Sequence, residues 1–204
     1  MRPTRLQKTL WLLVAVAALG AGGLALVERG RFSNDPPSPA TEGTLRADFE
    51  LTDHRGMVQT DEDFRGRWML VFFGFANCPD VCPTGLATIA EAMDALGDRA
   101  AEVQPIFVTV DPERDTPAVL ADYAPRFHPS ILGLSGTPEQ IARTTETFAV
   151  YRERIEDPAA PDGYTMGHTS SILLFDPEGE FVRTYEPDRS GEEIAADLAD
   201  RIDA

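Results

Sequence analysis

A continuous apolar run ends just before the only two cysteines of the chain. Trp68 to Phe75 read WMLVFFGF, and Cys78 and Cys82 follow shortly afterwards. An uninterrupted apolar run of this length is typical of a strand that is buried on both faces, as in a parallel sheet covered by helices. Reactive groups in such sheets lie just beyond the carboxyl ends of the strands. We therefore expect the cysteines to form a chemical site.

The spacing of the two cysteines favours reactivity over a structural role. A disulfide between Cys78 and Cys82 would close a very short loop, which limits its effect on chain entropy. Pro83 suits the first position of a helix, so we expect the pair in a loop that leads into a helix N-terminus. The free N–H groups and the dipole at that end lower a cysteine pKa. This predicts a redox-active or metal-binding pair rather than an inert buried one.

The N-terminal part carries a long uncharged run at residues 9–27, TLWLLVAVAALGAGGLALV. Its length matches a helix that crosses a bilayer. Arg2, Arg5 and Lys8 precede it, so we expect residues 1–8 in the cytoplasm and the rest on the periplasmic or another extracytoplasmic side. The chain would be a single-pass protein of the inner (cytoplasmic) membrane. A cleaved signal peptide is the alternative, and it also exports the domain to a compartment where disulfides persist.

Composition limits the partners of the exported part. Residues 28–44 include the stretch NDPPSP and are expected to form an extended linker before a domain at 45–204. Of the 18 basic residues, three precede the apolar run, which leaves 15 against 34 acidic residues and a formal charge near −19. This charge argues against nucleic acid and against docking on anionic lipid.

From residue 45 onward, short strand-like and helix-like segments alternate. We expect a hairpin at 47–52 and 57–60, a strand at 68–75, a helix after the cysteines, a strand at 103–110, a helix from 116, a strand at 131–134, a helix at 137–148, a hairpin at 171–175 and 180–185, and a helix at 191–202. This order indicates an α/β, thioredoxin-like fold with an N-terminal β-hairpin. The polar, proline-rich segment 156–167 is expected to be a loop that is mobile without metal.

Of the three histidines, we expect His168 alone to reach the cysteines. His54 lies in a predicted turn and His128 in a connection between a helix and a strand. His168 lies just before the strand at 171–175, a position that adjoins the dithiol loop in a thioredoxin-like fold. Two thiolates and one imidazole suit copper, with zinc as the competitor. A structural zinc ion normally takes four protein ligands.

Four segments together resemble the SCO/SenC family: GFANCPDVCP at 74–83, VDPERDTP at 110–117, LGLSGT at 132–137 and GHT at 167–169. The resemblance runs in order from about residue 47 to residue 202. It implies a membrane-anchored, thioredoxin-like copper protein that helps to assemble the dinuclear copper centre of cytochrome c oxidase subunit II. It also implies that Cys78, Cys82 and His168 are the copper ligands.

The chain departs from the family pattern near these residues. The family often has histidine where Asn77 stands and aspartate where Gly167 stands. Loss of that carboxylate removes a group that could orient His168. We interpret Met166 as packing, and Asp111 as part of a turn that could also serve as an outer group of the site or as partner surface.

Two functions remain open. A copper metallochaperone would bind the ion through Cys78, Cys82 and His168 and pass it to cytochrome c oxidase subunit II or a similar copper-accepting protein. A thiol-disulfide reductase would need the dithiol alone. We expect a metallochaperone rather than an enzyme. A peroxidase shares the fold plan, but Trp11 and Trp68 are not placed for it, and a purely structural module would require permanently oxidised cysteines.

Overall fold

Strand β3 (Trp68–Gly74) is the central element of the fold. The computed structural model describes residues 45–204. Strand β3 pairs in parallel with β4 (Val103–Thr109) and antiparallel with β8 (Ile172–Phe175). Every residue of β3 after Trp68 is buried, which confirms the strand that the apolar run predicts.

The central sheet has the strand order β2-β1-β5-β4-β3-β8-β9. Its remaining strands are β1 (Glu50–Asp53), β2 (Val58–Thr60), β5 (Leu132–Ser135) and β9 (Phe181–Tyr185). Strand β5 runs parallel to β4, whereas β1 with β2 and β8 with β9 form the two predicted hairpins. Because β3 and β4 are parallel and in register to their last residues, Gly74 and Thr109, the segments that follow them start at the same edge of the sheet.

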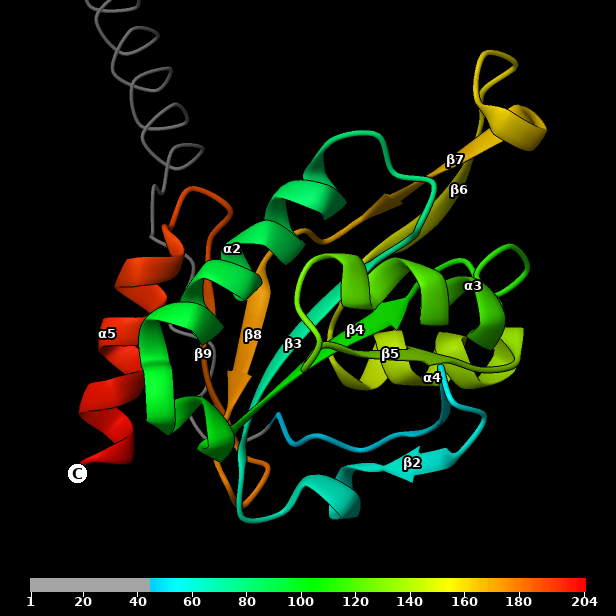
Figure 1. The fold of residues 1–204 in the computed structure, drawn as a ribbon. Helices are drawn as coiled ribbons and strands as arrows, with labels where there is room; N and C mark the ends of the chain where they lie inside the picture. Colours follow the sequence, from blue (N-terminus) through cyan, green and yellow to red (C-terminus); the bar gives the residue numbers. More distant parts are fainter. Residues whose placement is uncertain (1–44) are drawn as a thin grey trace, which may run out of the picture. The chain divides into compact units, whose positions relative to one another are not determined.

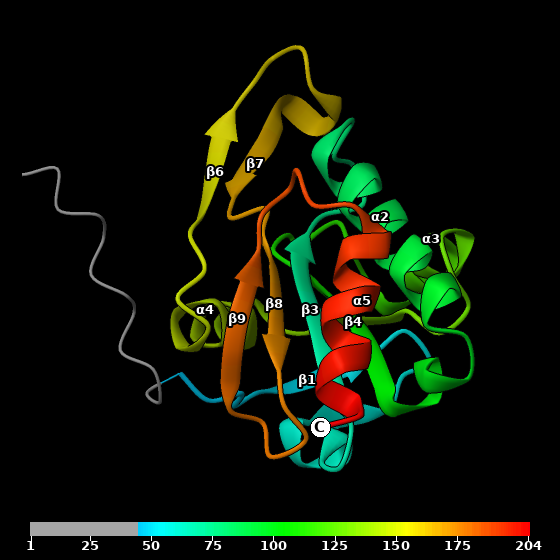
Figure 2. The ribbon, with the colours of Figure 1, turned by 90° about the vertical axis from the view of Figure 1, so that its left-hand side faces the viewer.

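Helices cover both faces of this sheet. They are α2 (Val81–Leu96), α3 (Pro117–Tyr123), α4 (Pro138–Thr147) and α5 (Gly191–Ile202), with 3-10 turns η1 (Asp61–Phe64), η2 (Gly97–Glu102), η3 (Ala124–Arg126) and η4 (Pro161–Gly163). Figure 2 shows the strands between α4 on one side and α2 and α3 on the other. The predicted α/β, thioredoxin-like plan with an N-terminal hairpin is therefore confirmed for the described part.

The helix starts follow local capping chemistry. The side chain of Thr116 accepts a hydrogen bond from the backbone N–H of Val119, and Pro117 opens α3, one residue after the predicted helix start. Thr137 and Gln140 form a capping box at the start of α4, and Ser190 and Glu193 form another at the start of α5.

Helix α2 begins earlier than predicted. It starts at Val81, so Cys82 lies in its first turn instead of in the preceding loop. Pro83 does not prevent this, because the first N–H groups of a helix have no partner within the helix and a proline there removes no bond. Cys78 remains in the loop and Cys82 belongs to the helix.

The prediction of a loop over residues 156–167 is wrong for the second half of that segment. Strand β7 (Tyr164–His168) pairs with β6 (Arg152–Glu156) in a separate two-stranded sheet, which we call the arm. Figure 1 shows the arm rising beyond the central sheet. Strand β6 is polar and largely exposed, so it lacks the apolar alternation that reveals a strand in a sequence. Mobility of the remaining loop stays a prediction.

The predictions for the N-terminal part lie outside the described residues. They are the cytoplasmic segment 1–8, the anchor at 9–27 and the linker at 28–44. Within residues 45–204, no helix combines the length and the apolar character needed to cross a membrane.

The contact between α5 and α2 gives a stability prediction. A Cβ atom at Gly191 would lie 2.6 Å from the backbone oxygen of Thr88 and 2.7 Å from the backbone nitrogen of Ala92. Because backbone atoms cannot turn aside, Gly191→Ala should lower the free energy of unfolding by about 1–3 kcal/mol. Urea denaturation measures this. The exposed neighbour Glu192 supplies the control, since Glu192→Ala should change the value by less than about 0.5 kcal/mol; equal effects of the two changes would contradict the close contact.

Candidate metal centre

The two cysteines lie where β3 passes into α2. The loop turns at once, since the backbone N–H of Cys78 donates to the carbonyl oxygen of Phe75 at 3.2 Å. Cys82 then packs against the end of β3, where a Cβ atom at Gly74 would lie 2.9 Å from its Sγ. Glycine at this position therefore provides the space that the Cys82 sulfur fills. Cys82 is fully buried and Cys78 is 7% exposed.

His168, the last residue of β7, turns its imidazole toward this pair. Its Nε2 lies 3.3 Å from the Sγ of Cys82. Its Nδ1 lies 2.8 Å from the carbonyl oxygen of Thr169. A carbonyl oxygen can only accept, so Nδ1 carries the proton and Nε2 offers a lone pair to the sulfurs. The edge of the Phe75 ring supports the imidazole from one side, with centroids 5.8 Å apart and planes at 90°.

The structure thus brings together the three side chains that the sequence singles out. The two Sγ atoms and one imidazole nitrogen all lie within 4.8 Å of one another. Two sulfurs and an imidazole lone pair that converge on one point form a soft donor set, which suits copper better than magnesium, calcium or manganese. That these residues bind a metal stays a prediction at this stage.

The two thiols differ in acidity. The hydrogen bond from the Cys82 thiol lowers the pKa of Cys78 to about 4, against the opposing effect of burial, and the backbone N–H of Cys82 adds a hydrogen bond to the Cys78 sulfur at 3.4 Å. The same side-chain hydrogen bond, followed by burial, raises the pKa of Cys82. The reduced site therefore holds a thiolate at Cys78 and a protonated thiol at Cys82, poised beside the imidazole of His168.

A buried carboxyl supports the cysteine loop from behind. Asp115 is 1% exposed, and its Oδ2 accepts from the backbone N–H of Ala76 at 2.9 Å and from the hydroxyl of Thr109 at 2.7 Å. Burial raises the pKa of Asp115, although both hydrogen bonds act to lower it. Asp115 does not cap α3, because the side chain of Thr116 has that role. The carboxyl of Asp115 instead joins the ends of β3 and β4.

The remaining residues named from the sequence lie outside the thiol and imidazole group, in turns, on the surface or against the core. His54 accepts from the backbone N–H of Gly133, and His128 contacts Ser130 in a turn, so neither joins the thiol group. Asn77 is exposed, and Met166 packs against the core.

Gly167 carries no carboxylate that could bind His168. Two side chains cover this glycine, one from β6 and one from the residue just before that strand. A Cβ atom placed at Gly167 would lie 3.1 Å from Ile155 and 3.6 Å from Tyr151. The hydrogen bond to Thr169 thus orients the imidazole from within the chain itself.

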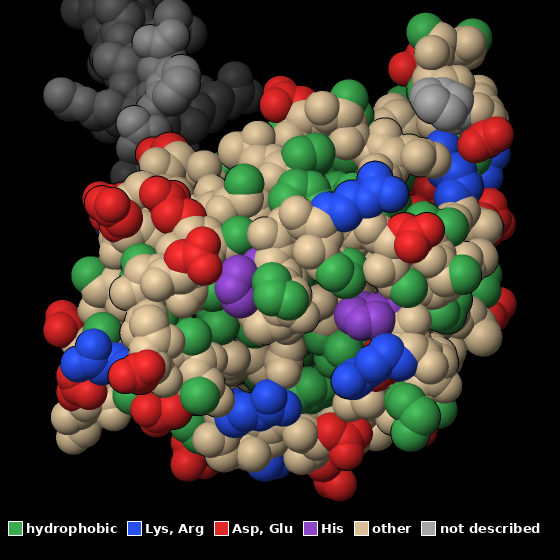
Figure 3. All heavy atoms as spheres, viewed as in Figure 1, with side chains coloured by type: hydrophobic (Ala, Val, Ile, Leu, Met, Phe, Trp, Pro, Cys, Tyr) green, Lys and Arg blue, Asp and Glu red, His purple; other side chains and the backbone are tan. Residues whose placement is uncertain are grey.

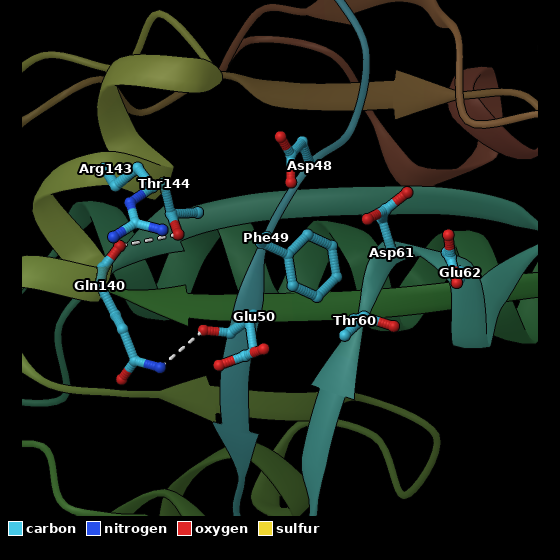
Figure 4. A pocket seen from close by; sticks show the side chains of 9 residues that line it. All are labelled: Asp48, Phe49, Glu50, Thr60, Asp61, Glu62, Gln140, Arg143 and Thr144. Carbon is cyan, nitrogen blue, oxygen red and sulfur yellow. Dashed lines mark hydrogen bonds between the residues drawn. The ribbon is translucent and has the colours of Figure 1, made fainter.

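A pocket of about 460 Å³ lies apart from these residues (Figure 4). Strands β1 and β2 and helix α4 form it, and carboxylates of Asp48, Glu50, Asp61 and Glu62 face it together with Arg143. Its lining shares no residue with the thiol and imidazole group, so the candidate metal centre is the site at the carboxyl end of β3.

Comparison with known proteins places the chain in a family. The sequence profile described as SCO1/SenC matches residues 37–203, which is most of the chain. The chain belongs to the SCO1/SenC family. Among relatives, the bovine (Bos taurus) protein named SCO2 homolog, mitochondrial is 39% identical over 194 residues, covering 92% of this chain and 73% of that protein.

Solved structures of the family share the fold. ScoI of Bradyrhizobium japonicum, solved with copper bound, has a TM-score of 0.71 and 44% identity, and the match covers 76% of this chain and 98% of that one. Yeast Sco1, also solved with copper bound, has a TM-score of 0.71 and 33% identity, covering 79% of this chain and 90% of that one. The family that the sequence motifs indicate is thus confirmed, and so is its fold.

The unequal thiols of this family member give a pH prediction. In the reduced chain, the ultraviolet thiolate absorbance of Cys78 should persist far below the ordinary cysteine pKa of about 8.5 and disappear only as the pH falls through the lowered value. Because the Cys82 thiol is the largest cause of the shift, Cys82→Ala should move the inflection upward. Cys78→Ala should abolish the signal at low pH, because Cys82 loses its hydrogen bond to Cys78 but stays buried, and burial still raises its pKa. An inflection at the ordinary value in the unsubstituted chain would contradict the described hydrogen bonding.

Proposed function

We propose that the chain is a copper metallochaperone that is anchored in the membrane and assists assembly of the dinuclear copper centre of cytochrome c oxidase. Cys78, Cys82 and His168 hold the copper ion in this proposal. The observation that carries it is the direction of the His168 lone pair. The carbonyl of Thr169 fixes the proton on Nδ1, which leaves Nε2 free beside the two sulfurs.

The donor set favours copper over zinc. Thiolate and imidazole ligands suit copper in either oxidation state, and affinity among divalent ions rises to copper. Three protein ligands fall short of the four that a structural zinc ion takes. Relatives solved with copper bound, at 44% and 33% identity, support the same choice.

Uptake and release follow from the acidity of the two thiols. Cys78 is already a thiolate and offers the first sulfur ligand. Cys82 must lose its proton as the ion arrives, so binding releases a proton and strengthens as the pH rises. Transfer to the acceptor then proceeds by exchange of ligands. The acceptor we propose is cytochrome c oxidase subunit II or a similar copper-accepting protein.

A thiol-disulfide reductase is the second candidate, because one low-pKa thiol and one buried thiol also suit that chemistry. The Cys78 thiolate would attack a disulfide sulfur of the partner and release one partner thiolate. Cys82 would then attack the sulfur of Cys78 and release the second. The chain ends oxidised and the partner reduced by two electrons. His168 has no necessary role in these steps, and this separates the two functions.

Copper stoichiometry tests the proposal. The reduced chain should bind one equivalent of copper, and the cupric form should show sulfur-to-copper charge-transfer bands, because two thiolates and one imidazole complete the site. His168→Ala should weaken binding and change the spectrum, and replacing both cysteines by serine should abolish both. His128→Ala is the matched control, since His128 lies in a turn apart from the thiol group.

The variants also separate the candidate functions. Binding that is lost in the cysteine variants but unchanged in His168→Ala would remove the histidine from the site. Such a result, or a complete lack of specific binding, would shift the case to the dithiol reductase. Loss of binding in His128→Ala would show that the effect of a histidine change is not local.

We also propose that residues 9–27 anchor the chain in the inner membrane, with residues 45–204 on the periplasmic side. The length of the uncharged run and the preceding Arg2, Arg5 and Lys8 support this topology. In bacterial cells, the chain should remain in membranes after alkaline carbonate extraction and keep its N-terminus. Its domain should be digested by protease added to spheroplasts, whereas a chain lacking residues 1–27 should be protected inside. A mature form that begins near residue 26 would instead show a cleaved signal peptide.

A further inference from the structure

The arm that carries His168 is fixed to the body of the domain by a cluster of four side chains, which we call the clamp: Asp111, Arg114, Arg154 and Tyr164. We propose that the clamp positions His168 for the metal, and that its integrity sets how long the ion is retained. The inference rests on the proposed copper site. It gives a role to the VDPERD segment, which the metal ligands themselves leave unexplained.

The ring of Tyr164 is the centre of the clamp. The Cζ atom of Arg114 lies 3.7 Å from the ring centre, and that of Arg154 lies 3.6 Å from it. Two planar guanidinium groups cannot share one face of a ring at this distance, so the ring is held between them. Tyr164 is 4% exposed, and the side chain of Arg114 is 11% exposed. Attraction between a cation and an aromatic face is stronger when both are desolvated. The face covered by Arg114 therefore contributes more than the face covered by Arg154, whose side chain is 48% exposed.

Polar contacts fix the same side chains in direction. Asp111, which is 4% exposed, accepts from the Nε of Arg114 and, at 3.1 Å, from the hydroxyl of Tyr164. The NH1 group of Arg114 also donates to the carbonyl oxygen of Tyr164 at 3.2 Å. The side chain and the backbone of one arm residue are therefore both bound to the loop that follows β4. A planar guanidinium that stacks and donates together cannot be replaced equally by lysine.

Charge balance at the outer side of the clamp comes from acidic neighbours. Arg154 pairs with Glu113 at 3.2 Å and with Glu156 at 3.3 Å. Figure 3 shows basic side chains beside acidic ones where the arm meets the body of the domain. The ring of Tyr164 therefore links Arg114, in the loop after β4, to Arg154 in β6.

The geometry of β7 transmits this fixation to the imidazole. Side chains alternate along a strand, so Tyr164, Met166 and His168 lie on one face. Tyr164 is buried in the clamp, Met166 packs against the core, and His168 reaches Cys82. Beyond its pairing with β6, strand β7 joins no other strand of the described residues. The clamp is therefore a main attachment of the strand whose last residue supplies the imidazole.

A second route runs through Phe75. The guanidinium of Arg114 lies 5.9 Å from the centre of the Phe75 ring, and that ring meets His168 edge-on. Arg114 is thus layered between the ring of Tyr164 and the ring that supports the imidazole. Loss of the stack would therefore loosen β7 and change the position of Arg114 beside the Phe75 ring.

The test compares copper dissociation rates from the purified chain into an excess of a cuprous chelator. Tyr164→Leu should speed dissociation by about tenfold, because groups that orient a ligand histidine typically affect metal affinity to this degree. Tyr164→Phe should give a smaller change, since the ring stays between the guanidinium groups and only the hydroxyl is lost. Tyr185→Leu is the matched control, because Tyr185 is also a buried tyrosine with a carboxylate at its hydroxyl and an arginine over its ring, but it contacts α5 and lies outside the clamp.

A coupling measurement shows whether the clamp acts through the histidine. In a His168→Ala background, Tyr164→Leu should leave the copper dissociation rate unchanged. Equal acceleration in both backgrounds would overturn the proposal, because the clamp would then act on the cysteines or on the whole fold. No acceleration beyond that of Tyr185→Leu would overturn it as well.

Hydrogen exchange of the metal-free chain tests the role of the clamp independently of copper binding. In the reduced, metal-free chain, Tyr164→Leu should increase amide hydrogen exchange in residues 164–168 while exchange in β3 stays unchanged. If the unsubstituted chain fails to bind copper, the proposed function fails, and the exchange result alone still decides whether the clamp fixes β7. Unchanged exchange in that strand would overturn the positioning role.

Discussion

The parallel pairing of β3 with β4 is the constraint on which the rest of the site depends. The two strands are in register up to Gly74 and Thr109, so the chain leaves both of them at one edge of the sheet. One exit provides the loop of Cys78, and the other provides the Asp111 to Asp115 segment. The carboxyl of Asp115 then joins the exits through the N–H of Ala76 and the hydroxyl of Thr109. A buried carboxyl is costly without partners, and here the partners belong to the two strands that must be held together.

Each ligand position is set by a different physical means. Cys82 is set by packing, because the missing side chain of Gly74 leaves room for its sulfur. The sulfur of Cys78 is held by hydrogen bonds from Cys82, which also stabilise its thiolate and lower its pKa. His168 is set by a backbone carbonyl that chooses the tautomer. Gly167 precedes the histidine, and the Thr169 carbonyl shows that the imidazole can be oriented without a carboxylate at that position.

The sequence is sufficient to predict the parts of this structure that repeat a strong local pattern. The apolar runs at β3 and β4 are buried, as such runs require. Helices α3 and α4 each begin with a threonine cap followed by a proline, which is a strong local signal for a helix start, so they too lie where they are expected. The three candidate ligands also meet as expected, because their positions follow from the fold plan. The arm could not be predicted in this way. Strand β6 is exposed and charged, and the buried contacts of Tyr164 involve residues more than 50 positions earlier in the chain, such as Asp111. The buried role of Asp115 is equally non-local, since a residue beside a helix start is more often a cap.

The division of the three candidate ligands between the core and the arm has a thermodynamic consequence. Two sulfurs belong to the loop and first turn of a helix that packs on the central sheet, so ordering them costs little when an ion binds. The imidazole belongs to the arm, which the clamp rather than strand pairing holds to the body of the domain, so the conformational entropy lost on binding depends on how firmly the clamp holds β7. Under the proposed copper function, the two sulfurs in the rigid part would determine the preference for a soft ion, and the clamp would determine how readily the ion leaves. Changes of arm residues would then alter the rate of release without altering which ion is preferred.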